Sequence, residues 1–589
     1  MTARAKTFWG LFRRNITRLT TVIAIVAVSV GFMAGIGEVE QKIKIGMARE
    51  YVSRRVSDFQ IKSSLPSGFT ETQLSAVEAR YGKGATSRWM SYDVAGEGDG
   101  ATRVYVGDLS SPINRLVVKE GRLPTAIGEV ALLQHTGFIK ETAAIGESVT
   151  VAEHTYQVVG IVQSPMHLYK QREPAVGLDG RHLTAVLYLS APVLPVCTDV
   201  YVAIENRDTE AFTYQYDKEI KEEQAALSAM LGESAVVLSL HQNLGIGSMV
   251  AYAEKVGLIG IIFVVFFLLV TLLVVFSTTS RLLSEERGRV ACMKTLGYGD
   301  GQILWKYVAF VLFGTLIGGG IAFALGYGLT SVIYYAFNMQ YVMPPFPKGA
   351  RFLYYLLTLL LIVGTTTLLT YLTGKRMVKD KPAVLLTPRA PKAGKKVLLE
   401  RMPVIWNKLA FRYKSSFRNV FLFKSRFFMT VLAVTGATVL VFAGMALIDC
   451  AVLREDTASL LAISAILLVF SAVLCALVIY NLTNINVAER SREIATLMVL
   501  GYTDHEVAWY IYREIYIMSA ISAVLGLPCG LGFVDLVFGM ISFGAISQIT
   551  WKTWVLTPVL TMAFSVISTL LLRHKIVGTD MNASLKTLE

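Results

Sequence analysis

The apolar residues of this chain gather in eight long blocks that are separated by polar stretches. A helix needs roughly 20 apolar residues to cross the hydrocarbon core of a bilayer, and the blocks are of about that length or longer. The pattern therefore predicts eight transmembrane helices. They are expected at residues 19–37, 254–279, 307–336, 353–373, 427–448, 459–481, 509–540 and 552–573.

The region between the first two blocks, residues 38–253, follows a different pattern. Stretches with apolar residues at helical spacing predict helices at 71–81 and 209–231. At its two ends, residues 38–52 and 242–255 extend the neighbouring spans and predict helical stalks. Short runs rich in β-branched and aromatic residues predict strands, so the region is expected to be an α+β domain. These strands are expected at 102–106, 129–133, 148–151, 156–162 and 185–189.

A charged segment that ends in Leu-Gly-Tyr occurs twice, at residues 285–298 and 489–502. The copies lie 204 positions apart, and the same offset aligns Trp305 with Trp509 further along the chain. A long apolar stretch follows each copy. We therefore expect an α-helical membrane protein of eight transmembrane helices in two four-helix repeats, with the α+β domain inserted between helices 1 and 2.

The composition agrees with a membrane protein. Hydrophobic residues make up 53% of the chain and charged residues 17%, and the mean hydropathy is +0.52. Soluble domains carry about 25% charged residues. The first block follows several basic residues, as in a signal peptide, but it lacks a clear small-residue cleavage site and is read as an uncleaved first span.

The net charge of +13 is concentrated next to the membrane. The linker 374–426 carries 15 Lys and Arg residues and two acids, so its excess equals that of the whole chain. Because basic residues beside spans mark the cytosolic side, the linker predicts the orientation of the chain. Contact with the anionic lipid of the bilayer explains this charge better than nucleic acid, which is not expected as a partner.

On this basis we expect a multi-pass protein of the bacterial cytoplasmic (inner) membrane with both termini in the cytosol. Its expected parts are a cytosolic N-terminus with the first span (1–37), an extracellular domain (38–253), spans two to four (254–373), the basic cytosolic linker (374–426), spans five to eight (427–573) and a cytosolic tail (574–589).

The extracellular domain offers no catalytic or metal site by sequence. It holds one cysteine, Cys197, which cannot close a disulfide within the domain. Its histidines lack metal-ligand spacing and are expected at the surface. No G-x-x-x-x-G-K-[ST] phosphate loop occurs, so we expect no cofactor and no bound ATP in this chain. The histidines are His135, His154, His167, His182 and His241.

Each copy of the repeated segment predicts a short amphipathic helix that ends at a glycine, Gly297 or Gly501. Apolar residues form one face of each helix beside charged ones. Such a helix either docks in the groove of a cytosolic partner or lies at the membrane surface and merely turns the chain. The apolar residues are Met293 and Leu296 in the first copy and Leu497, Val499 and Leu500 in the second.

The second copy reads Glu-Arg-x-Arg-Glu-Ile-Ala-x-Leu-x-x-Leu-Gly from Glu489 to Gly501, which resembles the loop signature of FtsX/MacB-type permeases of ABC transporters. The first copy is a weaker version that departs from the pattern at Gly288 and Arg289. In the α+β domain, Glu120-Gly121-Arg122-Leu123-Pro124 and the runs 145–149 and 156–162 are similar to the MacB-type extracellular core.

This resemblance implies a permease subunit of a type VII ABC transporter. A separate ATPase, expected as a dimer, would bind and hydrolyse ATP, and the chain itself would not be an enzyme. The short helices would dock on that ATPase and transmit motion to the extracellular domain, a mode called mechanotransmission. The residues expected to couple are Glu285, Arg289, Met293, Leu296, Gly297, Glu489, Arg492, Glu493, Leu497, Leu500 and Gly501.

The resemblance implies export or extraction of a peptide, antibiotic or lipophilic substrate, and it leaves open an extracellular adaptor or lipoprotein partner. The alternative is a membrane scaffold or sensor that regulates a cell-envelope enzyme without transport. Within the spans, glycines such as Gly326 and Gly530 predict close helix packing. Asp535 is the one acid expected well inside a span, which makes it a functional candidate.

Overall fold

The computed structural model describes residues 3–96, 98–191, 193–205, 211–349, 352–386, 411–422, 424–453 and 458–573. Much of the basic linker and the whole C-terminal tail therefore lie outside the described residues. The chain forms two compact units. The helical unit comprises Met1–Glu38, Leu258–Thr330 and Ala350–Glu589, and the α/β domain comprises Val39–Gly257 and Ser331–Gly349.

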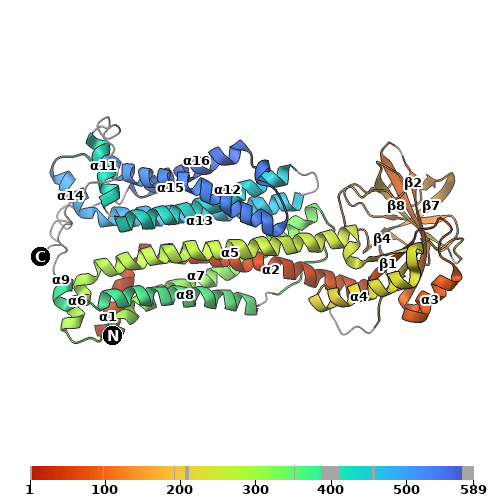
Figure 1. Ribbon diagram of the computed structural model, residues 1–589, viewed down its shortest axis with the longest axis horizontal. Coiled ribbons are helices and arrows are strands. Elements are labelled where there is room, and N and C mark those ends of the chain that lie inside the picture. Colours follow the sequence, from red (N-terminus) through yellow and green to blue (C-terminus); the bar gives the residue numbers. More distant parts are fainter. Residues whose placement is uncertain are drawn as a thin grey trace. The chain divides into compact units, whose positions relative to one another are not determined.

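Eight of the described helices are long and apolar enough to cross a membrane, and each overlaps one predicted span. Their apolar sequences favour burial in lipid. They extend well beyond most of the predicted boundaries, because the polar residues that flank a block continue the same helix. These helices are α2 (Ile16–Arg54), α5 (Leu244–Glu285), α7 (Asp300–Ala336), α8 (Phe352–Val378), α12 (Lys424–Val452), α13 (Ala458–Glu489), α15 (Asp504–Ile541) and α16 (Trp551–Leu571) (Figure 1).

Small residues let these helices approach closely. A Cβ added at Gly326 of α7 would lie 3.0 Å from the carbonyl oxygen of Gly31 in α2. At the equivalent position, 204 residues later, a Cβ on Gly530 of α15 would lie 2.8 Å from the ring of Phe442 in α12. Neither site has room for a side chain without a shift, which agrees with the predicted packing role of these glycines.

The α/β domain is built on a ten-stranded mixed sheet in the order β10-β1-β9-β2-β3-β8-β5-β7-β4, with β6 paired to β7. β3 and β8 are parallel, as are β5 and β7, and the remaining pairs are antiparallel. The strands are β1 (Phe59–Ser63), β2 (Thr86–Ala95), β3 (Gly100–Gly107), β4 (Val117–Gly121), β5 (Glu129–Leu133), β6 (Ser148–Val151), β7 (His154–Gln163), β8 (His182–Ser190), β9 (Asp199–Val202) and β10 (Ala235–Ser239).

Two helices, α3 (Glu71–Tyr81) and α4 (Tyr214–Leu231), cover the β1 end of this sheet. Their apolar faces pack on Phe59 and Ile61 of β1 in one buried cluster. α3 has the predicted bounds, whereas α4 begins later than predicted because Thr213 caps it, with its side-chain oxygen accepting the backbone N–H of Tyr216. The middle strands were predicted, but β1, β2, β4, β9 and β10 were not.

The connection between α7 and α8 belongs to the α/β domain, which the sequence did not predict. Tyr341 forms a β-bridge with Tyr169. The N–H of Lys170 donates to the carbonyl of Gln340 at 2.8 Å, and the N–H of Val342 donates to that of Leu168 at 2.7 Å. Residues 331–349 are thus attached to the domain by backbone hydrogen bonds rather than forming a simple turn.

Asp58, just beyond the end of α2, ties several elements of the α/β domain together. Its buried carboxylate accepts the hydroxyls of Tyr51 in α2, at 2.5 Å, and Tyr216 in α4, at 2.9 Å. It also accepts the N–H of Ile204 at 2.7 Å, and its backbone carbonyl accepts the N–H of Leu240 at 2.9 Å. Burial raises the pKa of this carboxyl to about 7.

We predict that Asp58 makes the stability of the α/β domain depend on pH. Because its pKa is higher in the folded domain than in the unfolded chain, the folded domain binds more protons from about pH 4 to pH 7. Stability should therefore fall by up to about 1.4 kcal/mol per pH unit as pH rises through this range, and Asp58→Asn should flatten the slope. Hydrogen exchange of β1 and β9 in the full chain, corrected for intrinsic rates, measures how the stability of the domain changes with pH. An unchanged slope in the variant would show that Asp58 is not the group responsible.

Candidate functional site: two coupling elbows

Each repeated segment forms an elbow, which we define as elbow 1 (residues 285–298) and elbow 2 (residues 489–502). In each, a long helix breaks at a single residue, Glu286 or Arg490, and a nine-residue helix follows. These short helices are α6 (Arg287–Thr295), between α5 and α7, and α14 (Ser491–Val499), between α13 and α15 (Figure 1).

Both elbows end in the same backbone motif. Gly297 and Gly501 have φ angles of +84° and +90°, which glycine adopts without steric cost. The next N–H, of Tyr298 or Tyr502, donates at 3.1 Å to the carbonyl five residues earlier. The glycine N–H donates at 3.0 Å to the carbonyl three residues earlier in each copy. These paired bonds define a Schellman motif, so the repeat in sequence is a repeat in backbone geometry.

The inner face of each short helix is anchored to the helical unit. Val290 and Ala291 of α6 are buried in a cluster with Ile303 and Tyr307 of α7. In α14, Ile494 and Ala495 are buried at the equivalent positions, and Ile494 packs with Val507, Ile511 and Ile515 of α15. Apolar burial therefore fixes which face of each short helix points outward.

The outward face ends in an exposed leucine in both copies. Leu296 is 76% exposed and Leu500 is 70% exposed, each directly before its glycine. Val499 and Tyr502 are exposed beside Leu500. We call Leu296 and Leu500 the elbow leucines. Their exposure in two equivalent places gives the site what a docking helix needs, an apolar contact held at a fixed angle.

A buried ion pair joins the breaking residue of each elbow to the next long helix. In elbow 2, the guanidinium of Arg490 lies 2.8 Å from the carboxylate of Glu514 in α15, with both side chains less than 5% exposed. In elbow 1, the carboxylate of Glu286 lies 3.9 Å from the ammonium of Lys306 in α7. The charges are reversed between the copies, with the acid on elbow 1 and the base on elbow 2.

Elbow 1 also bonds to helices other than α7. Arg18 of α2 forms two hydrogen bonds with the carboxylate of Glu285, at 2.8 and 2.5 Å. Arg287 donates at 2.6 Å to the carbonyl of Val384 in α9 (Pro382–Leu386), and Lys294 forms an ion pair with Asp300 at 3.1 Å. Elbow 1 is thereby fixed to both α2 and the segment after α8.

The predicted coupling residues fall into distinct environments. Glu285 binds Arg18, Arg289 contacts Glu286, and Glu493 lies 2.8 Å from Arg490. The charges of Arg289 and Glu493 therefore act within their own elbows, whereas Glu285 ties elbow 1 to α2. Met293 and Leu497 are only partly exposed and pack on the buried clusters, while the two leucines stand outward. The side chains of Glu489 and Arg492 lie outside the described residues.

The two halves of the helical unit meet in a buried polar seam beside the elbows. Asn481 of α13 accepts the hydroxyl of Thr21 in α2 at 3.0 Å and donates to that of Thr278 in α5 at 3.1 Å. Arg281 of α5 donates to Asn486 of α13 at 3.4 Å. All five side chains are buried, so displacement of α5 against α13 would break hydrogen bonds that water cannot readily replace.

Sequence reasoning missed Glu286, Arg490 and Glu514 as the residues that fix the elbows. Glu514 lies within the predicted span 509–540, and an acid inside an apolar block is a signal that the sequence offers. Asp535, in the same span, was chosen as the functional candidate instead. Asp535 is exposed on α15, whereas Glu514 is buried. Its pairing with Arg490 could not be read from spacing, because the elbow helix separates the two residues.

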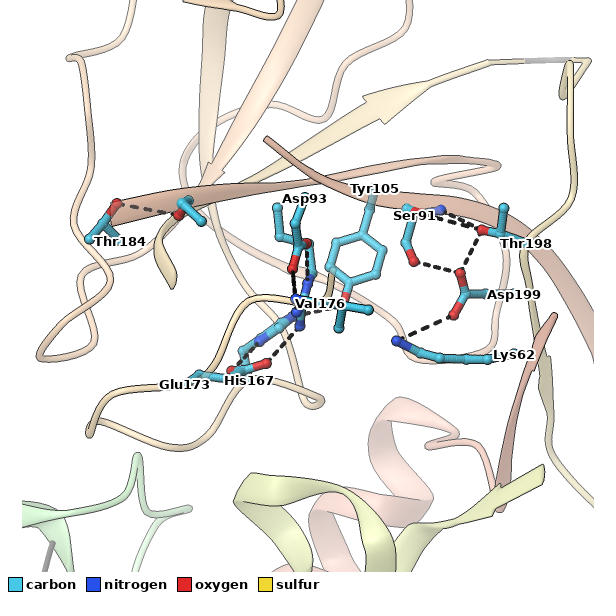
Figure 2. Close-up of polar contacts among 12 residues, drawn as sticks. Lys62, Ser91, Asp93, Tyr105, His167, Glu173, Val176, Thr184, Thr198 and Asp199 are labelled. Atoms are coloured by element: carbon cyan, nitrogen blue, oxygen red, sulfur yellow. Dashed lines mark hydrogen bonds and ion pairs between the residues drawn. The ribbon is translucent and has the colours of Figure 1, made fainter. Parts of the chain in front are cut away.

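The α/β domain contains a cluster of charged and polar side chains around Arg103 (Figure 2). Arg103 donates to both oxygens of Asp93, at 2.7 and 2.8 Å, and to Glu173 at 2.7 Å. His167 contacts Glu173 at 3.3 Å and the hydroxyl of Tyr105 at 3.2 Å. His167 is buried, which corrects its predicted surface position. These groups satisfy one another inside the domain, so the cluster is a structural network.

The eight apolar helices indicate a multi-pass membrane protein, and its two elbows are similar. Residues 261–382 and 465–581 both match the family described as the FtsX-like permease C-terminal domain. The matched segments begin 204 positions apart, and each contains one elbow. They support an ABC transporter permease, a class of membrane protein that is not itself an enzyme and generally works with an ABC ATPase. The comparison with curated proteins gave no match.

We predict that Glu514→Ala loosens elbow 2 alone. Removing one member of a buried ion pair leaves the other charge poorly compensated and costs about 3–5 kcal/mol. Hydrogen exchange of residues 491–499 should therefore accelerate, with residues 287–295 unchanged. Asp535→Ala, an exposed acid on the same helix, is the matched control. Equal protection of residues 491–499 in the wild type and Glu514→Ala would rule out the ion pair as the anchor.

Proposed function

We propose that this chain is the permease subunit of an ABC transporter, and that it couples ATP hydrolysis by a separate cytosolic ATPase to movement of its α/β domain outside the membrane. The observation that carries the proposal is the pair of elbows. Each presents an exposed leucine on a helix whose other face is buried and whose ends are fixed by an ion pair and a glycine.

Helix α5 is the element that would carry the motion. It is continuous over 42 residues, from Leu244 in the α/β domain to Glu285 at elbow 1, and is therefore about 63 Å long. α2 likewise contributes residues to both units over 39 residues. An α-helix of this kind resists bending, so a push on elbow 1 reaches the α/β domain without substrate passing through the helical unit.

One chain supplies two elbows, so we propose a single permease chain on an ATPase dimer. The docking sites would be unequal, because elbow 1 is tied to α2 and α9 while its helix directly follows α5. Elbow 2 follows α13, which begins at Ala458 and carries no inserted domain. Elbow 1 would then move the α/β domain and elbow 2 would hold the second half of the helical unit on the ATPase.

The proposed setting is the bacterial cytoplasmic membrane, with elbows and both termini in the cytosol and the α/β domain outside. The excess of Lys and Arg near elbow 1 and after α8 supports this orientation. The MacB-like segments of the α/β domain support export or extraction of a peptide, antibiotic or lipophilic molecule, with an adaptor or lipoprotein as a further partner. ATP would be bound by the ATPase alone.

The second candidate is a scaffold or sensor that controls a cell-envelope enzyme. The firm attachment of residues 331–349 to the α/β domain favours it, because such a domain can report a conformational state without moving a substrate. Both candidates use the same elbows and differ in what meets the α/β domain outside.

We predict that Leu296→Asp combined with Leu500→Asp abolishes copurification with the co-expressed ATPase and leaves membrane insertion intact. A charge at the centre of an apolar contact would be desolvated on docking, which is unfavourable. Leu65→Asp, at an exposed leucine of the α/β domain, is the control. Pull-down of the ATPase measures the effect. Normal copurification of the double variant would refute the elbows as docking sites.

We also predict that removal of the sheet separates docking from function. The N–H of Leu240 bonds to the carbonyl of Asp58, so residues 59–239 can be replaced by a short Gly-Ser linker that spans adjacent backbone positions. The variant should retain the ATPase in a pull-down but lose transport or enzyme control in cells. Full function without these residues would show that the sheet is not needed for function. Loss of the ATPase from the pull-down would show that the sheet is needed for docking.

A further inference from the structure

A lateral groove lies between α7 and α8, in the half of the helical unit that carries elbow 1. Its volume is about 520 Å³, within the ~300–1,000 Å³ of typical ligand pockets. Its lining is almost wholly apolar and includes Gly301, Trp305 and Leu312 of α7 and Gly364, Thr367 and Tyr371 of α8. A Cβ added at Gly301 or Gly364 would meet no atom within 4 Å, so these glycines leave space along the groove.

One polar group in the groove lacks a partner. Thr365, Thr366 and Thr370 of α8 each donate a hydroxyl hydrogen bond to the carbonyl four residues earlier. The hydroxyl oxygen of Thr367 is buried, and within the described residues it has no hydrogen-bond partner. Thr367 lines the groove, but its hydroxyl oxygen is covered by protein atoms, so the surface that the groove offers to a ligand stays apolar.

Cations stand at the end of the groove nearest elbow 1. The ammonium of Lys375 lies 5.8 Å from the ring centre of Tyr371, which lines the groove. Lys379 follows one turn later on the same face of the chain's helical path. Both lysines are exposed, and among the described residues neither takes part in an ion pair. Trp305 and Tyr371 are residue types that favour the membrane interface.

Two positions that line the groove carry larger side chains in the second half of the helical unit. At the offset of 204, Gly301 is replaced by His505 and Leu312 by Tyr516. The hydroxyl of Tyr516 lies 2.8 Å from that of Thr569 in α16, a hydrogen bond that ties α15 to α16. At these two positions the halves therefore differ in the size of the side chain.

We propose that the groove binds an anionic phospholipid, with one acyl chain between α7 and α8 and the phosphate at Lys375 and Lys379. The apolar lining matches the acyl chain, and the two lysines, which form no ion pair with any described residue, match the phosphate. Gly301 is in the first turn of α7, so a bound lipid would set the spacing of α7 and α8 beside elbow 1.

The test is photolabelling of the full chain in phosphatidylcholine nanodiscs. The probe is phosphatidylglycerol with a diazirine on one acyl chain, compared with a phosphatidylcholine probe that carries the same chain. We expect labelled peptides from α7 and α8 around Trp305 and Tyr371, at least about fivefold more with the anionic probe. Lys375→Gln with Lys379→Gln should remove this preference, and Gly364→Leu should remove labelling by filling the groove.

Gly532→Leu is the matched control, because it is also a membrane-helix glycine with no atom within 4 Å of an added Cβ and it lies on α15. It should label as the wild type does. Equal labelling by both probes, or labelling that Gly364→Leu does not reduce while the variant melts normally, would overturn the proposal in favour of ordinary surrounding lipid. The lysine variant decides the question if Gly364→Leu fails to fold. The assay needs no ATPase, so its outcome is independent of the proposed coupling.

Discussion

The two buried ion pairs at the elbows are the interactions on which the proposed coupling depends. Glu286 and Arg490 break the long helices, and Lys306 and Glu514 hold those breaks against the next helices. An ion pair with low solvent access gains little net stability over apolar packing, but it strongly disfavours separation of its members. Each pair therefore adds to the apolar packing that attaches a nine-residue helix to the following membrane helix.

The acid and the base of the ion pair are exchanged between the two elbows. Both polarities give the same attachment, so the copies can diverge in sequence while the geometry of the elbow is kept. The same reversal prevents one elbow from pairing with the partner of the other, because Glu286 would face Glu514 and Arg490 would face Lys306. The buried seam of Asn481, Thr21 and Thr278 then registers the two halves by hydrogen bonds.

Hydropathy predicted the membrane helices well, because an apolar block of spanning length has few alternative structures. It also identified Leu296 and Leu500, which remain exposed. It did not separate them from Met293, since the face that an amphipathic helix buries depends on the helices beside it. Strands such as β1 and β10 were missed because short segments with polar residues become strands only when neighbours pair with them. The Arg490–Glu514 pair likewise depends on how the chain folds back after the elbow.

Because residues 331–349 are attached to the α/β domain, that domain is built from two separate pieces of the chain rather than one inserted piece. The chain crosses between the two units at four places, near residues 38, 257, 330 and 349, rather than at the two ends of a single insertion. A domain acquired or exchanged as the stretch between α2 and α5 alone would arrive without its partner for Tyr169 and Lys170. A graft of this domain into another chain has to carry both pieces if these backbone bonds are to form.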